Sequence, residues 1–301
     1  MEHRGRYYLS RVHKYGQLDS DKIIAAINKP ATIVTGKYAW TITDALSYES
    51  DDKVQYVFGK LSKFNPEGIV KVVDDRQKVQ ANVIEPNLIE ASSSFVYVPA
   101  FEVVAYLHVW NQIEREVFAK RFARIVEETY GSFFAECKLE PITDLRNFSV
   151  RLESIDKFIE ISAKVHPPNP LFGKAWKSLK EYLDKRAASE LSLKEKGDER
   201  NPLNSRLADH VHGMLVQGAE YSESLDQPID ITDAAVLMAA DGYGDGKIVG
   251  RDRQTKSIVI IKVSETHRSF LFAADPDAQA LFEEVNKHIQ SINSERGLKH
   301  K

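Results

Sequence analysis

The chain contains a single cysteine, Cys137, among 301 residues. One thiol cannot form an intrachain disulfide, and it cannot supply the several thiolates of a structural zinc site. The N-terminal segment lacks the apolar core of a secretory signal peptide, and no apolar run approaches the roughly 18 residues of a membrane-spanning helix. The sequence therefore predicts a cytoplasmic protein that is not inserted in a membrane.

The chain also lacks a strong net charge. Its 41 Lys and Arg residues face 44 Asp and Glu residues, which gives a formal net charge of −3. A total of this size does not mark a nucleic-acid-binding protein, although local clusters of Lys and Arg can still contact phosphates. With 43% hydrophobic and 28% charged residues, the composition is that of a globular protein long enough for about two domains.

Short segments rich in β-branched and aromatic residues follow one another in the N-terminal part of the chain. Turn-forming residues separate them, and this spacing predicts a mostly antiparallel sheet. The predicted strands are 7–15, 37–46, 56–63, 68–73, 79–83, 92–98 and 103–107. A short helix is predicted over 21–27, and a long amphipathic helix over 111–130 ends at Gly131. We therefore predict a sheet-rich N-terminal domain over 1–131.

Residues 132–301 alternate between strand and helix patterns and predict a C-terminal domain of mixed α/β type. Its predicted strands are 132–139, 157–165, 246–249, 257–263 and 269–272, and its predicted helices are 145–152, 171–190, 205–216, 231–240 and 276–293. The polar segment near 193–204 is the expected linker, and 294–301 is expected to be a frayed basic tail. The fold class that follows is α+β.

The segment from Asp241 to Gly246 has the composition of a phosphate-binding loop. A dinucleotide-binding loop opens a helix, and a P-loop ends in Lys followed by Ser or Thr. Here a predicted strand follows, and the Lys-Ser/Thr ending is absent. The glycines are therefore expected to supply positive φ angles at a turn.

Two further motifs contain residue types that bind metals or act as nucleophiles. His210 and His212 lie two positions apart, which points them to different faces of a helix and away from one shared ion. Cys137 stands alone in a predicted strand and is expected to be a small buried hydrophobic residue. We predict no catalytic residue, no metal site and no cofactor from these motifs.

Glu136 and Lys138 form an E-x-K motif on a predicted strand. Metal-dependent nucleases of the restriction type use such a strand together with an upstream Asp, so that the carboxylates hold the metal and the lysine orients the attacking water. The long helix over 111–130 occupies the place where a strand ending in that Asp would lie. A nuclease that uses Glu136 and Lys138 is therefore kept as an alternative function.

Clustered Lys and Arg residues form the main candidate site. They lie on the predicted helices 171–190 and 111–130 and in the turn 251–256, and each cluster is suited to contact phosphate groups. The alternative interpretation is a solvated surface, because Glu181 and Asp184 dilute the first cluster. The candidate nucleic-acid-binding residues are Lys174, Lys177, Lys180, Lys185, Arg186, Lys120, Arg121, Arg124, Arg251, Arg253 and Lys256.

The segment from Ser94 to Val98, the following Ala105-Tyr106 and the long helix after them resemble part of the phage-exclusion proteins of the RexA type and related proteins of phage-defence loci. Similar to the same group are Leu152 to Ile155, Ile159 to Ile161, Pro168-Asn169-Pro170 before a helix, and Gly242-Tyr243-Gly244 before the closing strands. The resemblance covers about half of the chain, and none of these motifs is itself a binding residue. It implies a dimeric bacterial or phage defence protein that binds or senses DNA with little sequence preference.

The function expected from the sequence is therefore a non-enzymatic DNA-binding or sensing component of an anti-phage defence system. Its expected partners are double-stranded DNA, a second copy of the chain and a partner protein of a defence operon. Two alternatives stay open: a metal-dependent nuclease effector of such a system, and a protein-interaction scaffold subunit. An exposed apolar patch larger than a few hundred Å² would favour the scaffold.

Overall fold

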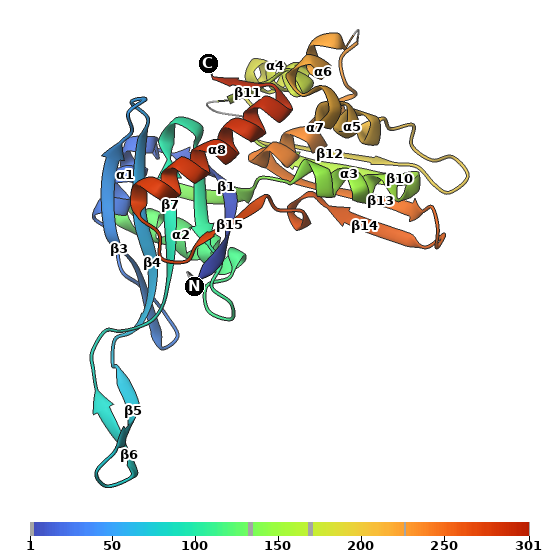
Figure 1. Ribbon diagram of the computed structural model, residues 1–301. Helices are drawn as coiled ribbons and strands as arrows, with labels where there is room; N and C mark the ends of the chain where they lie inside the picture. Colours follow the sequence, from blue (N-terminus) through green and yellow to red (C-terminus); the bar gives the residue numbers. More distant parts are fainter. Residues whose placement is uncertain (1–2, 132–134, 168–170, 226, 301) are drawn as a thin grey trace.

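A computed structural model describes residues 3–131, 135–167, 171–225 and 227–300. Two antiparallel sheets lie beside each other, and the C-terminal helix α8 (Ala278–Arg296) runs from the first sheet towards the second region (Figure 1). The strand pairs in the described part of the chain are antiparallel, and helices accompany both sheets. The predicted α+β class is confirmed.

The first sheet has the strand order β15-β1-β8-β7-β4-β3-β2, and β9 also pairs with β1. The strand β1 pairs with β15 near its start, with β8 in its middle and with β9 near its end. The strands are β1 (Arg4–Gly16), β2 (Ile33–Thr35), β3 (Tyr38–Glu49), β4 (Gln55–Asn65), β7 (Leu88–Val98), β8 (Val103–Leu107), β9 (Ala135–Pro141) and β15 (Ser269–Ala273). The strands predicted from alternating β-branched and aromatic residues are present.

Helices cover both faces of this sheet. On one face lie α1 (Ser20–Asn28) and α2 (Arg115–Tyr130), and α2 buries Phe118 and Phe122 completely. On the opposite face lies α8, whose Phe282 stacks on Tyr56 of β4 with ring centroids 4.0 Å apart. The amphipathic stripe predicted for the long helix is therefore its core-facing side.

A hairpin formed by β5 (Ile69–Asp74) and β6 (Val79–Ile84) projects from the end of β4 and β7, away from the rest of the molecule (Figure 1). We call it the arm. Val72, Val79 and Val83 share one of its faces and are 38%, 50% and 43% exposed. The arm therefore presents apolar surface that no other described element covers. A two-stranded hairpin on its own is marginally stable in water.

The second sheet has the strand order β12-β10-β13-β14. Helices lie on one face only, where Ile161, Ala163 and Ile248 are buried beneath α7. The strands are β10 (Ile155–Val165), β12 (Leu191–Lys196), β13 (Gly244–Asp252) and β14 (Ile258–Lys262). The accompanying elements are α3 (Leu145–Glu153), α4 (Lys177–Arg186), α5 (Leu207–Gln217), α6 (Ala219–Ser224), α7 (Ile231–Met238), β11 (Leu171–Gly173) and β16 (Leu298–His300).

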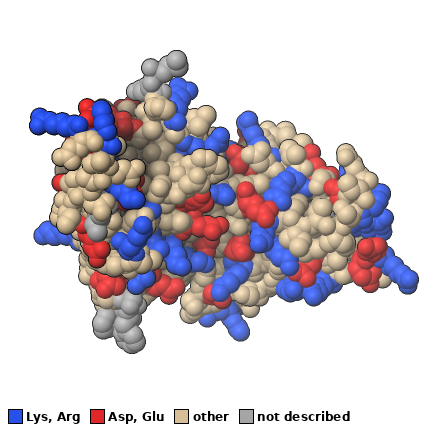
Figure 2. Space-filling view, turned by 90° about the horizontal axis from the view of Figure 1, so that it is seen from below, with Lys and Arg blue, Asp and Glu red and all other residues tan. Residues whose placement is uncertain are grey.

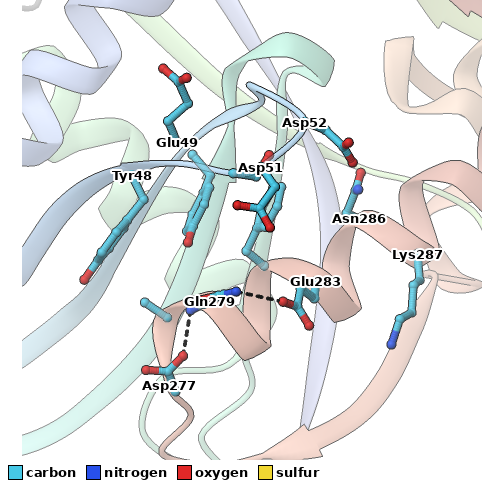
Figure 3. Close-up of a pocket in the computed structure, with 13 residues that line it drawn as sticks. Tyr48, Glu49, Asp51, Asp52, Asp277, Gln279, Glu283, Asn286 and Lys287 are labelled. Atoms are coloured by element: carbon cyan, nitrogen blue, oxygen red, sulfur yellow. Dashed lines mark hydrogen bonds between the residues drawn. The ribbon is translucent and has the colours of Figure 1, made fainter.

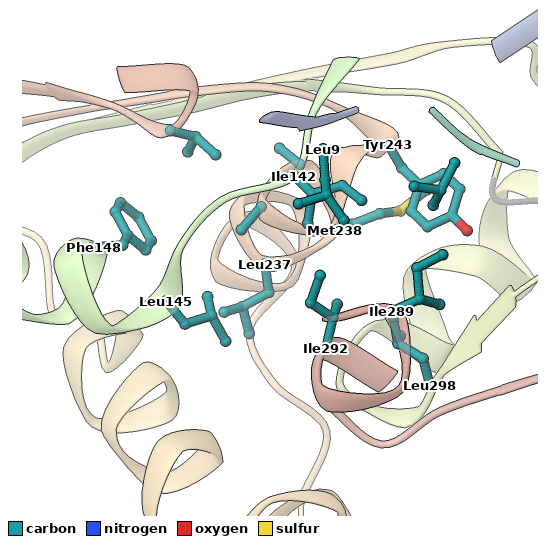
Figure 4. Packing of buried hydrophobic residues seen from close by; sticks show 14 of the residues in the cluster. Leu9, Ile142, Leu145, Phe148, Leu237, Met238, Tyr243, Ile289, Ile292 and Leu298 are labelled. Carbon is teal, nitrogen blue, oxygen red and sulfur yellow. The ribbon is translucent and has the colours of Figure 1, made fainter. Parts of the chain in front are cut away.

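The two predicted domains share elements and a core. Although β9, β15 and α8 follow residue 131 in the sequence, they complete or cover the first sheet. Figure 4 shows Leu9 of β1, Met238 of α7 and Ile292 of α8 packed in one cluster of buried residues. The boundary after residue 131 stays a prediction, and in this fold it separates strands that belong to the same sheet.

Three local expectations for the C-terminal part are wrong. The helix expected over 171–190 is only α4, because β11 precedes it and Ala187 ends it with a φ of +48°. The expected linker near 193–204 begins inside β12, which pairs with β10. The expected frayed tail is ordered as far as it is described, since Arg296 is buried and β16 pairs with β11.

Within the described residues, none of the helices has both the length and the hydrophobicity that crossing a lipid bilayer requires.

Candidate nucleic-acid interface

The basic cluster predicted around α4 is largely neutralised by its own helix. Lys177 pairs with Glu181 one turn later, and Lys180 is buried and pairs with Asp184. The expectation that Lys180 lies on the exposed face is therefore wrong, because its stem packs into the core. Lys185 and Arg186 are exposed, and the side chain of Lys174 lies outside the described part of the structure.

The turn between β13 and β14 also holds its cations in local contacts. Arg251 lies 3.9 Å from a carboxylate oxygen of Glu199, and Lys256 lies 3.3 Å from one of Asp156. The guanidinium of Arg253 donates to the carbonyl oxygen of Ile155. Because these acceptors lie next to its cations, the turn keeps only part of the positive charge expected from its sequence. The ion pairs are exposed and therefore weak.

The cations of α2 are the least neutralised of the three predicted clusters. Lys120 and Arg124 are exposed, and within the described residues neither forms an ion pair. The guanidinium of Arg121 lies 5.3 Å from the ring centroid of Trp40, so it is partly covered by cation–π packing. Burial and the neighbouring Arg124 lower the pKa of Arg121.

A larger basic surface comes from side chains of which the sequence singled out only Arg251. The face of the second sheet opposite α7 carries no helix, and we call it the open face. Strand register places Lys164, Lys194 and Lys247 on this side, since Ser162 lies opposite both Lys194 and Lys247. The basic residues of the open face are Lys157, Lys164, Lys194, Lys196, Lys247, Arg251 and Lys262, and its acidic residues are Glu160 and Asp245. Lys164 pairs with Glu190, which precedes β12, at 2.7 Å.

Glu160 lies at the centre of the open face among three lysines. Its carboxylate is 3.0 Å from Lys247 Nζ, 3.1 Å from Lys194 Nζ and 3.5 Å from Lys196 Nζ. Hydrogen bonds from Lys247 and Lys194 lower the pKa of Glu160 to about 2. A single carboxylate gathers these ammonium groups into one place without neutralising all of them.

The edge of the open face adds a like-charge pair and an apolar strip. Lys262 lies directly opposite Lys247 on the neighbouring strand, an arrangement that destabilises a sheet. Ile258 and Ile260 lie on the same side of β14 and are 52% and 51% exposed. Arrangements that lower stability, such as a like-charge pair and exposed isoleucines, are typical of functional surfaces.

The charge of the molecule as a whole is mixed. In the view from below, basic side chains are spread over the surface and alternate with acidic ones (Figure 2). Positive charge does not dominate the surface as a whole. It can be concentrated only on local faces such as the open face.

An acidic groove of about 480 Å³ lies between the β3–β4 turn and α8 (Figure 3). Stacked Tyr48 and Tyr56 form part of its lining. Its charged lining residues are Glu49, Asp51, Asp52, Asp277, Glu283 and Lys287. The excess of carboxylates would repel phosphates, so this groove is not part of a nucleic-acid interface.

A smaller cavity of about 220 Å³ lies where β1 approaches the end of β10. His13, Lys14, Glu102 and His166 line it. Burial lowers the pKa of His13 to about 3 and raises the pKa of Glu102. Each of these groups already has a partner in the protein, because His13 contacts the Gly242 carbonyl and Lys14 pairs with Glu102. These contacts join β1 to the segments that lead into β13 and β8, and the hydroxyl of Tyr15, which also lines the cavity, is buried without a hydrogen-bond partner among the described residues.

The predicted glycine turn is confirmed. Gly242 and Gly244 have φ angles of +85° and +153°, and the segment leads from α7 into β13. A side chain at Gly244 would meet the Lys164 carbonyl at 2.1 Å. Asp241 points into the core, where Arg296 and Trp176 hold its carboxylate at 2.6 and 2.8 Å. The loop is thus structural.

The remaining chemical motifs do not assemble a reaction centre. Glu136 and Lys138 lie on β9, but Lys138 pairs with Glu140, and no group of three metal-binding side chains occurs among the described residues. Burial raises the pKa of the Cys137 thiol, as a buried hydrophobic role predicts. His210 is buried and contacts the Tyr221 hydroxyl, whereas His212 is exposed.

Lys194 and Lys196 of the open face lie in β12, part of which falls in the segment 193–204 that the sequence predicts as a linker. The sequence of β12, Leu-Ser-Leu-Lys-Glu-Lys, alternates apolar and polar residues at the start, which is a strand pattern. The period of two continues in Lys194 and Lys196, and this periodicity was the signal available in the sequence.

Comparison with curated proteins finds no match. The model of one protein family matches residues 21–290, which is most of the chain and includes the second sheet and the first sheet except β1. That family is described as a domain of unknown function, DUF4747, and the chain belongs to it.

Proposed function

We propose that this protein is a non-enzymatic, DNA-binding component of an anti-phage defence system, and that the open face contacts the DNA backbone. The observation that carries the DNA-binding proposal is the excess of basic over acidic side chains on a sheet face without helices. The defence role rests on the resemblance of several segments to phage-exclusion proteins of the RexA type.

The dimensions of the open face suit a polyanion. Four strands spaced about 4.8 Å apart span roughly 15 Å, and β10 extends over roughly 35 Å. Lysines distributed over such an area contact phosphates of several neighbouring nucleotides without reading bases. Binding of this kind has little sequence preference and weakens steeply with salt.

The first test compares two variants that lose the same charge in duplex titrations at several salt concentrations. Lys196→Gln with Lys262→Gln removes two cations of the open face, and Lys185→Gln with Arg186→Gln removes two exposed cations of α4. The first variant should reduce the slope of log K against log salt by up to about 2, because each phosphate contact contributes about 0.9. The α4 variant should keep the wild-type slope.

Equal slopes in all three proteins would remove the open face from the interface, and absence of binding at low salt would refute the DNA-binding proposal. Magnesium is included, and DNA that is cut would contradict a non-enzymatic role. Bacteria that produce the protein and lose protection against phage only with the open-face variant would support the defence role.

We assign the predicted homodimer to the arm. Its aliphatic face is uncovered, and its two strands present unpaired edges that template pairing with another chain. Two identical arms related by a two-fold axis would cover each other's valines with the same surface. The exposed apolar face of the arm also favours the alternative function of a protein-interaction scaffold.

A further inference from the structure

Trp110 has the highest exposure among the large hydrophobic residues in the described part of the chain, at 75%. The other two tryptophans, Trp40 and Trp176, are 4% and 1% exposed. Trp110 lies in the loop between β8 and α2. The indole ring is thus mostly presented to water, and its amphipathic surface is available to a partner.

The loop that presents Trp110 is held rigidly. The backbone N–H of Val109 donates to Ile113 O at 3.0 Å, and the N–H of Ile113 donates back to Val109 O at 2.8 Å. Ile113 is completely buried, and Asn111 takes up the left-handed turn with a φ of +57°. The outward position of the indole is therefore fixed by the backbone, as in an interaction anchor.

Cations surround this loop. Lys63 Nζ donates to Gln112 Oε1 at 2.8 Å, and the Arg115 guanidinium lies 5.1 Å from the ring centroid of Tyr8. Neither Lys63 nor Arg115 forms an ion pair within the described residues. Lys63 also lies over the Tyr38 ring, 3.9 Å from its centroid. Glu114 is the carboxylate of this loop, so two cations and one acid belong to the loop and its contacts.

The geometry points to a second nucleic-acid contact, in which Trp110 stacks on an unpaired base of single-stranded DNA while Lys63 and Arg115 contact the flanking phosphates. An exposed aromatic ring near cations that form no ion pair is the arrangement that binds single strands with little sequence preference. This inference rests on the proposed DNA-binding function but uses a different surface and a different form of DNA.

A membrane surface fits the same loop less well. Insertion into lipid needs several neighbouring apolar side chains. The neighbours of Trp110 are polar, with His108 at a ring-centroid distance of 5.2 Å and Asn111 and Gln112 beside it in the chain. The indole is thus an isolated aromatic surface among hydrogen-bonding groups, which favours a base as its partner.

Intrinsic fluorescence tests this inference directly, because Trp110 is the exposed tryptophan. Adding an oligo(dT) single strand should quench the emission of the wild-type protein. Trp110→Ala should weaken oligo(dT) binding, measured with labelled DNA, by roughly ten-fold or more. Trp110→Phe should retain most of the affinity, and Val150→Ala, at a site 67% exposed on α3, should leave it unchanged.

The outcomes separate the two proposals. Weaker single-strand binding with unchanged duplex binding in Trp110→Ala supports the inference. Equal oligo(dT) affinity in Trp110→Ala and wild type overturns it, even if the open face binds duplexes. Quenching by phosphatidylserine vesicles without quenching by oligo(dT) also overturns it. Lack of binding to either form of DNA refutes both the inference and the proposed function.

Discussion

At the scale of single residues, the buried carboxylate of Asp241 joins several parts of the chain. It accepts from Arg296 and from the Trp176 indole, and its backbone carbonyl accepts from Arg11 Nε at 3.0 Å. These side chains come from β1, from the segment before α4 and from the end of α8. A buried ion pair needs such additional hydrogen bonds to offset its desolvation, and here they join three distant parts of the chain.

The buried imidazole of His13 makes stability depend on pH. Its pKa is lowered to about 3, chiefly by burial and further by His166 and Arg11. The unfolded chain binds a proton at this side chain near pH 6.5, whereas the folded chain does not until about pH 3. Stability from this group is therefore present above pH 6.5 and is lost as pH falls. Between pH 7 and 5 the loss is about 2 kcal/mol.

His13→Gln keeps a side-chain N–H for the Gly242 carbonyl but cannot titrate. Urea unfolding at pH 7 and pH 5 should show that the variant loses about 2 kcal/mol less than wild type over this interval. Glu102 and Glu140, whose pKa values are raised by burial, offset part of the loss in both proteins, so the difference between the proteins is the informative quantity. Identical losses would show that His13 takes up its proton over the same pH range in the folded and the unfolded chain.

The candidate site illustrates what a sequence conveys at this scale. Lys177 and Lys180 were identifiable as clustered cations, but their pairing with Glu181 and Asp184 depends on side-chain packing. Lys247 and Lys262 become neighbours only through the register of β13 and β14. Charge clusters within one element are therefore predictable, and clusters that span strands are not until the pairing is known.

At the scale of elements, the arm tests the proposed dimer. Val72→Asn with Val83→Asn makes one arm face polar, and light scattering should then report a monomer where wild type is a dimer. The melting temperature of the monomer should be nearly unchanged, because both positions are exposed in the isolated chain. Val34→Asn, at an exposed site on β2, is the matched control and should remain dimeric. A wild-type monomer would contradict the assignment.

Most strands and helices were predictable because their periodicity is local. β4 and β7 show β-branched and aromatic enrichment, and α2 shows apolar residues at spacings of three and four. The helix expected over 171–190 ends early because tertiary packing sets a left-handed residue at Ala187. The C-terminal segment contains only one apolar residue, Leu298, and its order comes from β11 and the buried Arg296.

At the scale of the whole molecule, the core cluster that the two sheets share predicts one unfolding transition. Arg296→Met leaves Asp241 buried without its ionic partner and should lower the free energy of unfolding by about 3–5 kcal/mol. Hydrogen exchange should then show protection falling together in β4 of the first sheet and β10 of the second. Arg124→Met, at an exposed site on α2, should leave both unchanged. Loss of protection confined to β10 would indicate two independently folding units.

The return of α8 to the first sheet also has a consequence for synthesis on the ribosome. By the time β8 emerges, most strands of that sheet are available to pair, yet the helix that covers one of its faces is made last. At translation rates of about 5–20 residues per second, that apolar face waits on the order of ten seconds or more for its cover. A nascent chain of this design depends on chaperones during that interval, and a ribosome that stalls before α8 leaves an aggregation-prone product.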